Sequence, residues 1–410
     1  MKLTQMEIWQ KNIVLFLISQ TVSLFGSSLV QYAIIWYITL KTQSGVMMTI
    51  SIICGFLPML VLSPFAGVWA DRYNRKVLIM LSDSFIALAT LILAVLFLAG
   101  YNAIWLLFVA SAARAFGTAV QVPAINAFIP QIVPVEKLTR VNAINGSIQS
   151  MVMLLSPMAS GALLAMTGIE RIFFIDVSTA ALAVLIILFF LPVPAHAKAA
   201  DKQKTGYFRD MKEGLRYIGN HSYVKRFFVF CAAFFLLAVP VAFLTPLQVT
   251  RSFGGDVWRL TAVEVAFSLG MTLGGMVIAA WGGFKNKVHT MAFASLVIGM
   301  TTFTLGIMPN FWLYLGVMCC GGIVLPFFNT PSIVLLQEKV EESFLGRVFG
   351  VMTMISSSVM PLGMLVFGPL ADMVKIEWLL MGTGLLMFIQ AFFLLGNKVL
   401  VEAGKPIPPV

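Results

Sequence analysis

Four ionisable side chains lie inside long apolar stretches of the chain, where a charge is costly. They are Arg114, Asp83, Asp176 and Glu264. An ionisable group in such a stretch is by default a candidate for function. Because burial disfavours the ionised form of a carboxyl, a buried acid is suited to binding and releasing protons. The three acids among them are therefore candidates for binding and releasing protons within the apolar part of the protein.

Each of these groups also has a structural alternative. Asp83 either carries a proton or joins the charges of the nearby polar loop, and Asp176 either carries a proton or pairs with Arg171. Arg114 and Glu264 have no opposite charge within a helical turn of the sequence. Each of those two must therefore find a partner elsewhere in the fold, a water-filled cavity, or a bound proton or substrate.

The stretches that position these residues are long and oily. The chain has 410 residues, of which 60% are hydrophobic and 11% are charged, too little charge to cover a soluble protein of this size. Many apolar runs reach the roughly 18 residues needed to cross a membrane. We predict an all-α membrane protein with twelve transmembrane helices, at 12–40, 46–70, 77–99, 103–128, 140–167, 172–192, 225–248, 259–282, 289–308, 312–335, 347–372 and 377–396.

The positive charges orient these spans. The loops on one side hold few of the 27 Lys and Arg residues, namely Lys41, Arg171, Arg251, Arg259 and Lys375. Because cytosolic loops carry the excess of Lys and Arg, both termini are predicted to be cytosolic. The net charge of +10 is explained by the same loops, and no nucleic acid is expected as a partner, since the chain has no Arg-rich tail or aromatic RNA-binding signature.

A polar stretch in the middle divides the spans into six and six. We predict an N-terminal six-helix bundle at 12–192, a cytosolic linker at 193–224 and a C-terminal six-helix bundle at 225–396. The linker should form an amphipathic helix on the inner membrane surface or in solvent. Its predicted apolar face consists of Phe208, Met211, Leu215 and Ile218.

The two halves carry a weak parallel repeat. Arg140 opens the fifth span and Arg347 opens the eleventh, and "KV" recurs at Lys76 and Lys287. A repeat across two pseudo-symmetric bundles is an architecture of transporters.

The loop after the second span has a dense charge cluster, "GVWADRYNRK". Asp71 lies at a helix end, where it can accept hydrogen bonds from the N–H groups of a facing helix, such as the one that begins near Arg347. Gly67 would allow close helix packing, and three cations follow: Arg72, Arg75 and Lys76. We interpret the cluster as a latch on the inner face; the alternative is that its cations only mark a cytosolic loop.

This cluster resembles the signature G-x-x-x-D-R-x-G-R-K/R of the major facilitator superfamily. Asn74 stands where the signature has Gly, and we expect it to adopt the same left-handed turn. "RAFGTAVQVPAINAFIPQIVPVEKLTR" and "FLGRVFG" resemble the drug:proton antiporter branch that includes macrolide-efflux proteins. The resemblance implies two six-helix bundles, acids that take up protons, and a span-four arginine that tunes them.

A second motif of that branch is degraded. "SPMASG" is similar to the antiporter signature G-P-x-x-G-G in span five, with Ser in place of two glycines. Ser156, Pro157 and Gly161 are therefore predicted to bend that helix.

A cavity for bulky amphiphiles needs adaptable apolar walls with a few polar groups. Half of the candidates could instead face lipid or other helices. The candidates are Gln31, Tyr32, Trp36, Asn126, Phe327, Phe328 and Asn329.

We expect a transporter and not an enzyme, without cofactor or metal, because no nucleotide-binding loop, H-E-x-x-H or G-x-S-x-G motif occurs. The first hypothesis is a proton-coupled drug exporter in a bacterial plasma membrane. The second is an exporter of another amphiphile, such as a lysolipid or siderophore, and the third is a non-transporting membrane sensor. The expected partners are a small drug-like molecule, protons and lipid; an ATP-binding partner protein stays open, because no residue indicates one.

Overall fold

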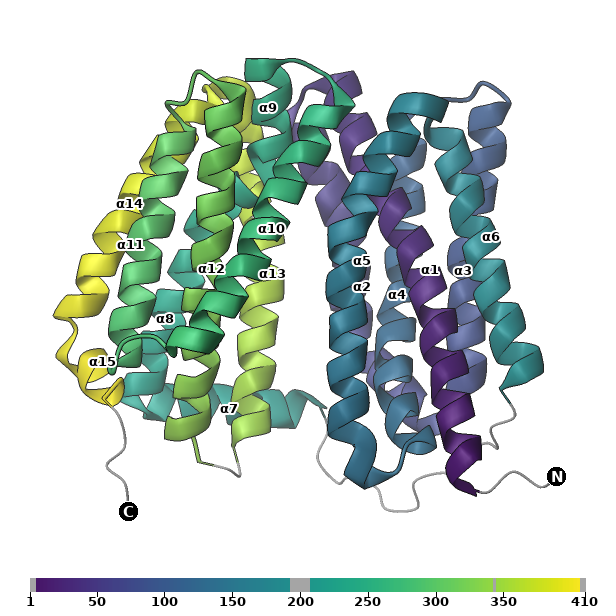
Figure 1. Ribbon diagram of the computed structural model, residues 1–410, viewed down its shortest axis with the longest axis horizontal. Helices are drawn as coiled ribbons and strands as arrows, with labels where there is room; N and C mark the ends of the chain where they lie inside the picture. The colour runs from purple at the N-terminus through teal and green to yellow at the C-terminus, as the bar shows by residue number, and fades with distance from the viewer. Residues whose placement is uncertain (1–4, 192–206, 342–343, 406–410) are drawn as a thin grey trace. The chain divides into compact units, whose positions relative to one another are not determined.

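The computed structural model describes residues 5–191, 207–341 and 344–405, apart from the side chains of 5–8, 63, 64, 68, 71 and 207–212. Within these residues the regular structure is entirely helical (Figure 1). Twelve helical stretches are long and apolar enough to cross a membrane. The predicted all-α class and the twelve spans are thereby confirmed.

The chain divides into two compact units. Unit 1 comprises Met1–Lys41 and Ile50–Lys202, and unit 2 comprises Thr42–Thr49 and Gln203–Val410. The short segment Thr42–Thr49, which includes the first turn of the second helix, therefore belongs to unit 2, whereas the rest of that helix belongs to unit 1.

Unit 1 is a bundle of long helices (Figure 1). Helix α3 packs against both α4 and α6. The elements are α1 (Gln5–Thr42), α2 (Gly45–Arg72), α3 (Arg75–Leu98), α4 (Ile104–Ile132), the 3-10 turn η1 (Val135–Lys137), α5 (Leu138–Thr167) and α6 (Ile169–Phe190).

Unit 2 also contains long helices, and it has several short helices in addition. Helix α10 packs on α12, and α11 packs on both α12 and α14. The elements are α7 (Tyr207–Asn220), α8 (Ser222–Leu237), η2 (Pro240–Leu244), α9 (Thr245–Phe253), α10 (Val257–Trp281), α11 (Lys287–Leu305), α12 (Phe311–Lys339), α13 (Leu345–Met373), α14 (Ile376–Gly396) and α15 (Lys398–Ala403).

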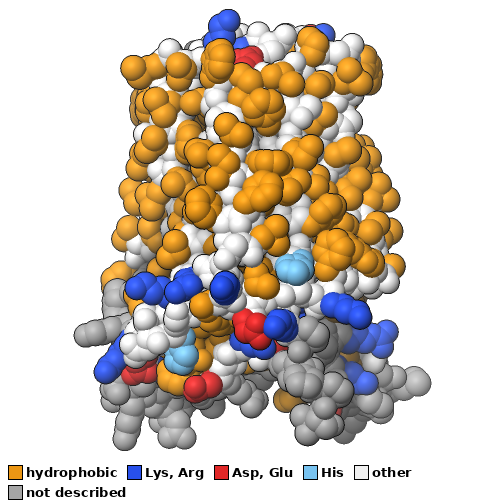
Figure 2. Space-filling view, turned by 90° about the vertical axis from the view of Figure 1, so that its left-hand side faces the viewer, with side chains coloured by type: hydrophobic (Ala, Val, Ile, Leu, Met, Phe, Trp, Pro, Cys, Tyr) orange, Lys and Arg blue, Asp and Glu red, His pale blue; other side chains and the backbone are white. Residues whose placement is uncertain are grey.

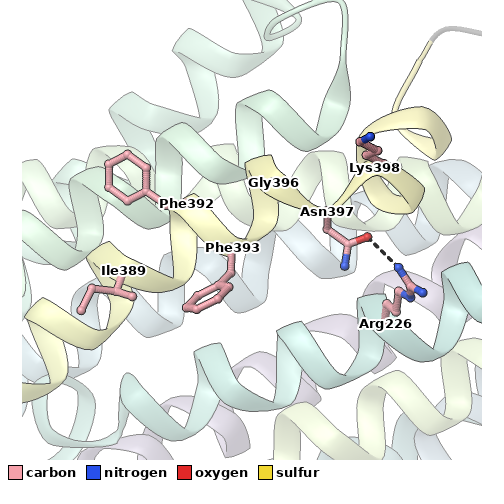
Figure 3. A pocket seen from close by; sticks show the side chains of 7 residues that line it. All are labelled: Arg226, Ile389, Phe392, Phe393, Gly396, Asn397 and Lys398. Carbon is pink, nitrogen blue, oxygen red and sulfur yellow. Dashed lines mark hydrogen bonds between the residues drawn. The ribbon is translucent and has the colours of Figure 1, made fainter.

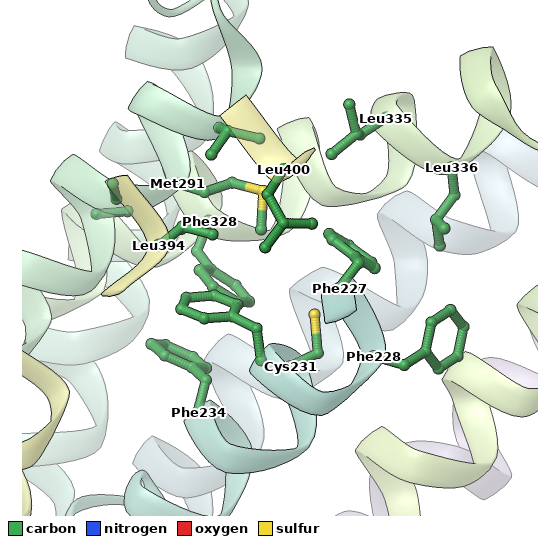
Figure 4. Close-up of a cluster of buried hydrophobic side chains, with 14 of the residues drawn as sticks. Phe227, Phe228, Cys231, Phe234, Met291, Phe328, Leu335, Leu336, Leu394 and Leu400 are labelled. Carbon is green, nitrogen blue, oxygen red and sulfur yellow. The ribbon is translucent and has the colours of Figure 1, made fainter. Parts of the chain in front are cut away.

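The core of unit 2 is rich in aromatic rings. Phe234 of α8 stacks on Phe328 of α12, with 3.9 Å between ring centroids, and Cys231 and Met291 fill the space around them (Figure 4). Small residues bring the helices together elsewhere: a Cβ atom at Gly274 of α10 would overlap the carbonyl oxygen of Ile323 on α12. Close backbone contact of this kind is typical of membrane helices, which gain little from hydrophobic burial against lipid.

The sequence predicts the seventh span as one continuous helix, whereas the structure divides it into three helical segments. It consists of α8, the π-helical segment η2 and α9, which together run over Ser222–Phe253. Pro240 begins η2 and Pro246 lies at the start of α9. Because proline has no N–H to donate to the preceding turn, the regular ladder is interrupted at each proline.

Helix α7 exists where the amphipathic helix is predicted, and one side of it is buried within unit 2. Tyr217 and Ile218 are buried, whereas Leu215 is 47% exposed, and a role of Leu215 at the membrane surface stays a prediction. Gly214 lies against the backbone of Arg347, and α7 packs on α13. The contact with α13, and not apolar periodicity alone, therefore selects the buried side. Phe208 and Met211 are outside the described side chains.

Candidate functional site

Four helices of unit 1 meet at a buried ion pair. The guanidinium of Arg114 (α4) binds the carboxylate of Asp176 (α6), which is fully buried. Thr90 (α3) accepts a hydrogen bond from Arg114 and donates one to Asp176 Oδ2 at 3.0 Å. Ser27 (α1) donates to Asp176 Oδ1 at 3.3 Å, and its carbonyl accepts from Arg114 at 3.2 Å. The alternative pairing of Asp176 with Arg171 is wrong.

A second buried acid, Asp83, lies two turns before Thr90 on the same face of α3. Its Oδ1 accepts hydrogen bonds from Ser23 Oγ at 2.6 Å and from Gln121 Nε2 at 2.7 Å. Its buried Oδ2 makes no hydrogen bond within the described part of the chain. No described cation pairs with Asp83, so its alternative as a member of the loop's charge network is wrong. A carboxyl with one unused oxygen has room for a proton there.

Glu264 lies on α10 of unit 2 and is half-buried. Among the described residues it has neither a hydrogen-bond partner nor an ion-pair partner. The structure therefore collects three of the four predicted proton-coupling residues in unit 1 and leaves Glu264 alone in unit 2.

The charge cluster after α2 binds helix ends. Arg75 donates to the carbonyl oxygens of Ala70 and Ala127, each at 3.0 Å, and Lys76 donates to that of Leu191 at 2.8 Å. Ala70 and Ala127 lie near the ends of α2 and α4, and Leu191 follows α6. Cations are favourable where helix carbonyls lack partners. These two cations thus hold three helix ends of unit 1 together.

The expectation of a left-handed Asn74 in this loop is wrong. Asn74 is not left-handed; its φ of −64° and ψ of 112° are those of an N-cap, and its side chain accepts a hydrogen bond from Lys76 N at 3.0 Å. Asn286 caps α11 in the same way at the start of the second "KV". A Cβ atom at Gly67 would meet no described atom within 4 Å, so close helix packing at this glycine stays a prediction.

The remaining residues of the predicted latch belong to both units, Arg72 and Arg140 to unit 1 and Arg347 to unit 2. Arg72 and Arg140 are exposed, and Arg140 lies in the first turn of α5. Arg347, at the start of α13, forms an ion pair with Glu213 of α7 at 3.2 Å and lies 5.3 Å from the ring of Phe344. Asp71 belongs to α2, but its side chain is outside those described, so its latch role stays a prediction.

The predicted cavity residues fall into two groups. Trp36, Phe327 and Phe328 are buried within their own units, and Trp36 contacts the half-buried Tyr32 at 5.5 Å between ring centroids. The polar members are exposed: Gln31, Asn126 and Asn329. Exposure alone does not distinguish a cavity from a lipid-facing surface, so the cavity stays a prediction.

The degraded antiporter motif lies in the buried side of α5. Ser156, Pro157 and Gly161 are buried, and the helix continues past Pro157. One turn later, Ser160 donates a hydrogen bond to the carbonyl of Leu29 on α1 at 3.0 Å. The motif therefore faces α1, and the predicted bend stays a prediction.

The family model of the Major Facilitator Superfamily matches residues 16–364. The chain belongs to the Major Facilitator Superfamily. It is therefore a multi-pass membrane protein of a transporter family and not an enzyme.

Curated relatives and solved structures agree with this assignment. The chain is 28% identical to Macrolide efflux protein A of Streptococcus pyogenes over 394 residues, 95% of this chain and 97% of that protein. It is 24% identical to the Multidrug efflux pump Tap of Mycobacterium tuberculosis (strain CDC 1551 / Oshkosh), over 85% of this chain and 83% of the pump. A crystal structure of the nucleoside transporter NupG covers 95% of this chain and 98% of its own, with a TM-score of 0.67 at 15% identity. A second match is the crystal structure of a bacterial homologue of the human lysosomal transporter Spinster, in an inward-facing and unoccupied conformation. The match covers 98% of this chain and 99% of that chain, with a TM-score of 0.69 at 13% identity. At these identities the two structures show the major facilitator fold alone.

The sequence-based candidates did not include one polar cluster, which forms around Asp372. Asp372, near the end of α13, accepts hydrogen bonds from Ser44 Oγ and Gly45 N, each at 2.7 Å, and from Val46 N at 3.0 Å. Arg251 of α9 pairs with the same carboxylate at 2.8 Å. Asp372 thus caps the first turn of α2 within unit 2.

Glycines make this cap possible. A Cβ atom at Gly45 would overlap the carbonyl oxygen of Gly368, one turn before Asp372, so the two helices touch through their backbones. The sequence signal was an acid at the end of one span and a glycine at the start of another, too general to connect without the fold.

Proposed function

We propose that this protein exports drug-like amphiphiles, macrolides foremost, in exchange for protons by alternating access. Support for the substrate class comes from its relatives, since proteins named for macrolide efflux and multidrug efflux align along most of the chain. The exposed Gln31, Asn126 and Asn329 are the polar groups we assign to the drug site, because each could bind a ligand without first breaking a buried contact.

The proton-coupling part of the proposal depends on one observation, the carboxyl of Asp83. It is 1% exposed, it has no described cation beside it, and its Oδ2 makes no hydrogen bond in the described part of the chain. Thr90 and the pair of Asp176 with Arg114 continue the polar row two turns further along α3. A proton on Asp83 removes the cost of a buried unpaired charge, whereas Asp176 already has its counter-charge.

We also propose that the protein resides in the bacterial plasma membrane with both termini in the cytosol. The bias of Lys and Arg toward the loops on the side of the termini supports this orientation. Reporter fusions that are active only in the cytosol or only outside it, placed at each terminus, test the assignment. Activity of the outside reporter at either terminus contradicts it.

The function is tested by expression in an efflux-deficient bacterium with a panel of macrolides and other amphiphilic drugs. We expect expression of the protein to make the bacterium less susceptible to macrolides. Asp83→Asn should abolish this protection. Asp256→Asn is the matched control, because it makes the same chemical change at an exposed acid before α10. Unchanged susceptibility to every drug, with the protein present in the membrane, contradicts the proposed substrate class and favours another amphiphile.

The energy source is tested with purified protein in proteoliposomes under an imposed pH gradient, without ATP. We expect uphill drug transport that requires the gradient. Transport in this minimal system would also show that no ATP-binding partner is needed. Transport that ignores the gradient rejects proton coupling.

A further inference from the structure

Unit 2 has an open groove between α8, α14 and α15, with a volume of about 740 Å³ (Figure 3). Its apolar part comes from the last turns of α14, and its polar part comes from the start of α8 and the turn into α15. The lining side chains are Ile389, Phe392, Phe393, Asn397, Lys398 and Arg226. The groove contains none of the residues assigned above to proton coupling, gating or drug binding.

The polar end of the groove has two cations without a counter-charge. Arg226 and Lys398 are both exposed, and no described carboxylate lies within 4.0 Å of either. Arg226 Nη1 donates a hydrogen bond to Asn397 Oδ1 at 3.2 Å, which leaves the other guanidinium nitrogens and the Asn397 amide N–H groups free to donate (Figure 3). Guanidinium, ammonium and amide donors around one space form a site for a phosphate group.

The apolar end of the groove lies on a membrane-spanning helix. Ile389, Phe392 and Phe393 of α14 are 41%, 53% and 74% exposed. Helix α14 ends at Gly396, one residue before Asn397, so rings and cations follow each other directly along the chain. Figure 2 shows the same order on this side of unit 2: hydrophobic side chains cover the middle, and a row of Lys and Arg side chains borders them below. The groove therefore crosses the boundary between hydrocarbon and headgroups.

We propose that this groove binds an anionic phospholipid in the leaflet on the side of the C-terminus. Its phosphate lies between Arg226 and Lys398 and accepts from Asn397, and its acyl chains cover Phe392, Phe393 and Ile389. A free phosphate ion would use only the polar end and leave the rings uncovered. A zwitterionic lipid would bring its own cation toward two protein cations. A bound lipid joins α8 to α14 and α15, and should therefore stabilise unit 2.

The test uses the full-length protein purified in detergent, with native mass spectrometry to count bound lipids and a melting curve to measure stabilisation. Phosphatidylglycerol and phosphatidylcholine are added separately at equal concentrations. We expect retained phosphatidylglycerol and a raised melting temperature, both weakened by high salt. Lys398→Gln removes the attraction of one basic residue to an anionic surface, so it should weaken phosphatidylglycerol binding roughly fivefold. The double variant Arg226→Gln/Lys398→Gln should lose the preference over phosphatidylcholine.

Lys225→Gln is the matched control, since Lys225 is the exposed neighbour of Arg226 on α8 but does not line the groove. It should bind phosphatidylglycerol as the unaltered protein does. Lys398→Gln breaks no described hydrogen bond, so its result does not depend on a folding defect. Three outcomes overturn the proposal: no preference for phosphatidylglycerol in the unaltered protein, an equal loss in Lys225→Gln and Lys398→Gln, or full stabilisation by inorganic phosphate alone.

Discussion

Arg114 on α4 and Asp176 on α6 neutralise each other inside unit 1, with side chains that are 10% and 0% exposed. Thr90 and Ser27 complete their hydrogen bonds from α3 and α1. Glu264 in unit 2 has no such partner among the described residues. The charges inside the helical bundles are therefore of two kinds, a neutralised pair between two helices and single acids without a described counter-charge.

Removal of one partner of the pair should destabilise the protein strongly. Asp176→Ala leaves the guanidinium of Arg114 buried without a counter-charge, a change that costs about 3–5 kcal/mol in buried ion pairs. The double variant Arg114→Met/Asp176→Leu removes both charges and should recover most of the lost melting temperature. A melting temperature for Asp176→Ala equal to that of the unaltered protein contradicts this assignment. If the pair also serves proton coupling, the stable double variant stays unable to transport uphill.

Glu264→Gln should separate a proton carrier from a structural residue. Because Glu264 has no described partner, the change should leave the melting temperature unaltered. We expect the variant to bind drug without dependence on pH and to fail in uphill transport, since the titrating group is gone. The measurements are drug affinity at two pH values, uphill transport in proteoliposomes and thermal melting on the same preparation. Retained uphill transport with a lowered melting temperature removes Glu264 from the coupling residues.

The sequence alone predicts the helical spans and the buried charges, but not the partners of those charges. Hydropathy identifies each span because length and apolar composition are local properties. The pairing of Arg114 with Asp176 joins two helices far apart in the chain, whereas spacing alone suggested the nearby Arg171 as the partner of Asp176. Helix α7 shows the same limit on a helix surface, because its packing on α13, which periodicity alone does not reveal, buries Ile218 and leaves Leu215 exposed.

Substitutions in the charge cluster after α2 should distinguish residues that anchor helix ends from a residue that acts as the inner latch. Lys76→Ala removes a donor from the carbonyl at the end of α6 and should lower stability by about 0.3–1 kcal/mol. Arg72→Ala, at an exposed position in the same loop, should leave the melting temperature unchanged. Asp71→Asn should abolish transport while the protein still reaches the membrane, if Asp71 is the inner latch. Full export by Asp71→Asn rejects the latch.

Asp372 and Asp256 allow a contrast between two acids that lie at helix starts. Asp372 accepts two backbone N–H groups of α2 as well as Ser44 and Arg251, whereas Asp256, at the N-cap position of α10, makes no side-chain capping bond. Asp372→Asn should therefore cost about 1–2 kcal/mol, and Asp256→Asn should cost little. Thermal melting measures both.

Hydrogen exchange locates the effect of Asp372. The amides of Gly45 and Val46 donate directly to its carboxylate, so Asp372→Asn should speed exchange in the first turn of α2 and leave the first turn of α10 unchanged. These bonds lie wholly within unit 2, because Gly45, Val46 and Asp372 all belong to it. Unchanged exchange at Gly45 and Val46 in Asp372→Asn would show that Asp372 does not hold the start of α2.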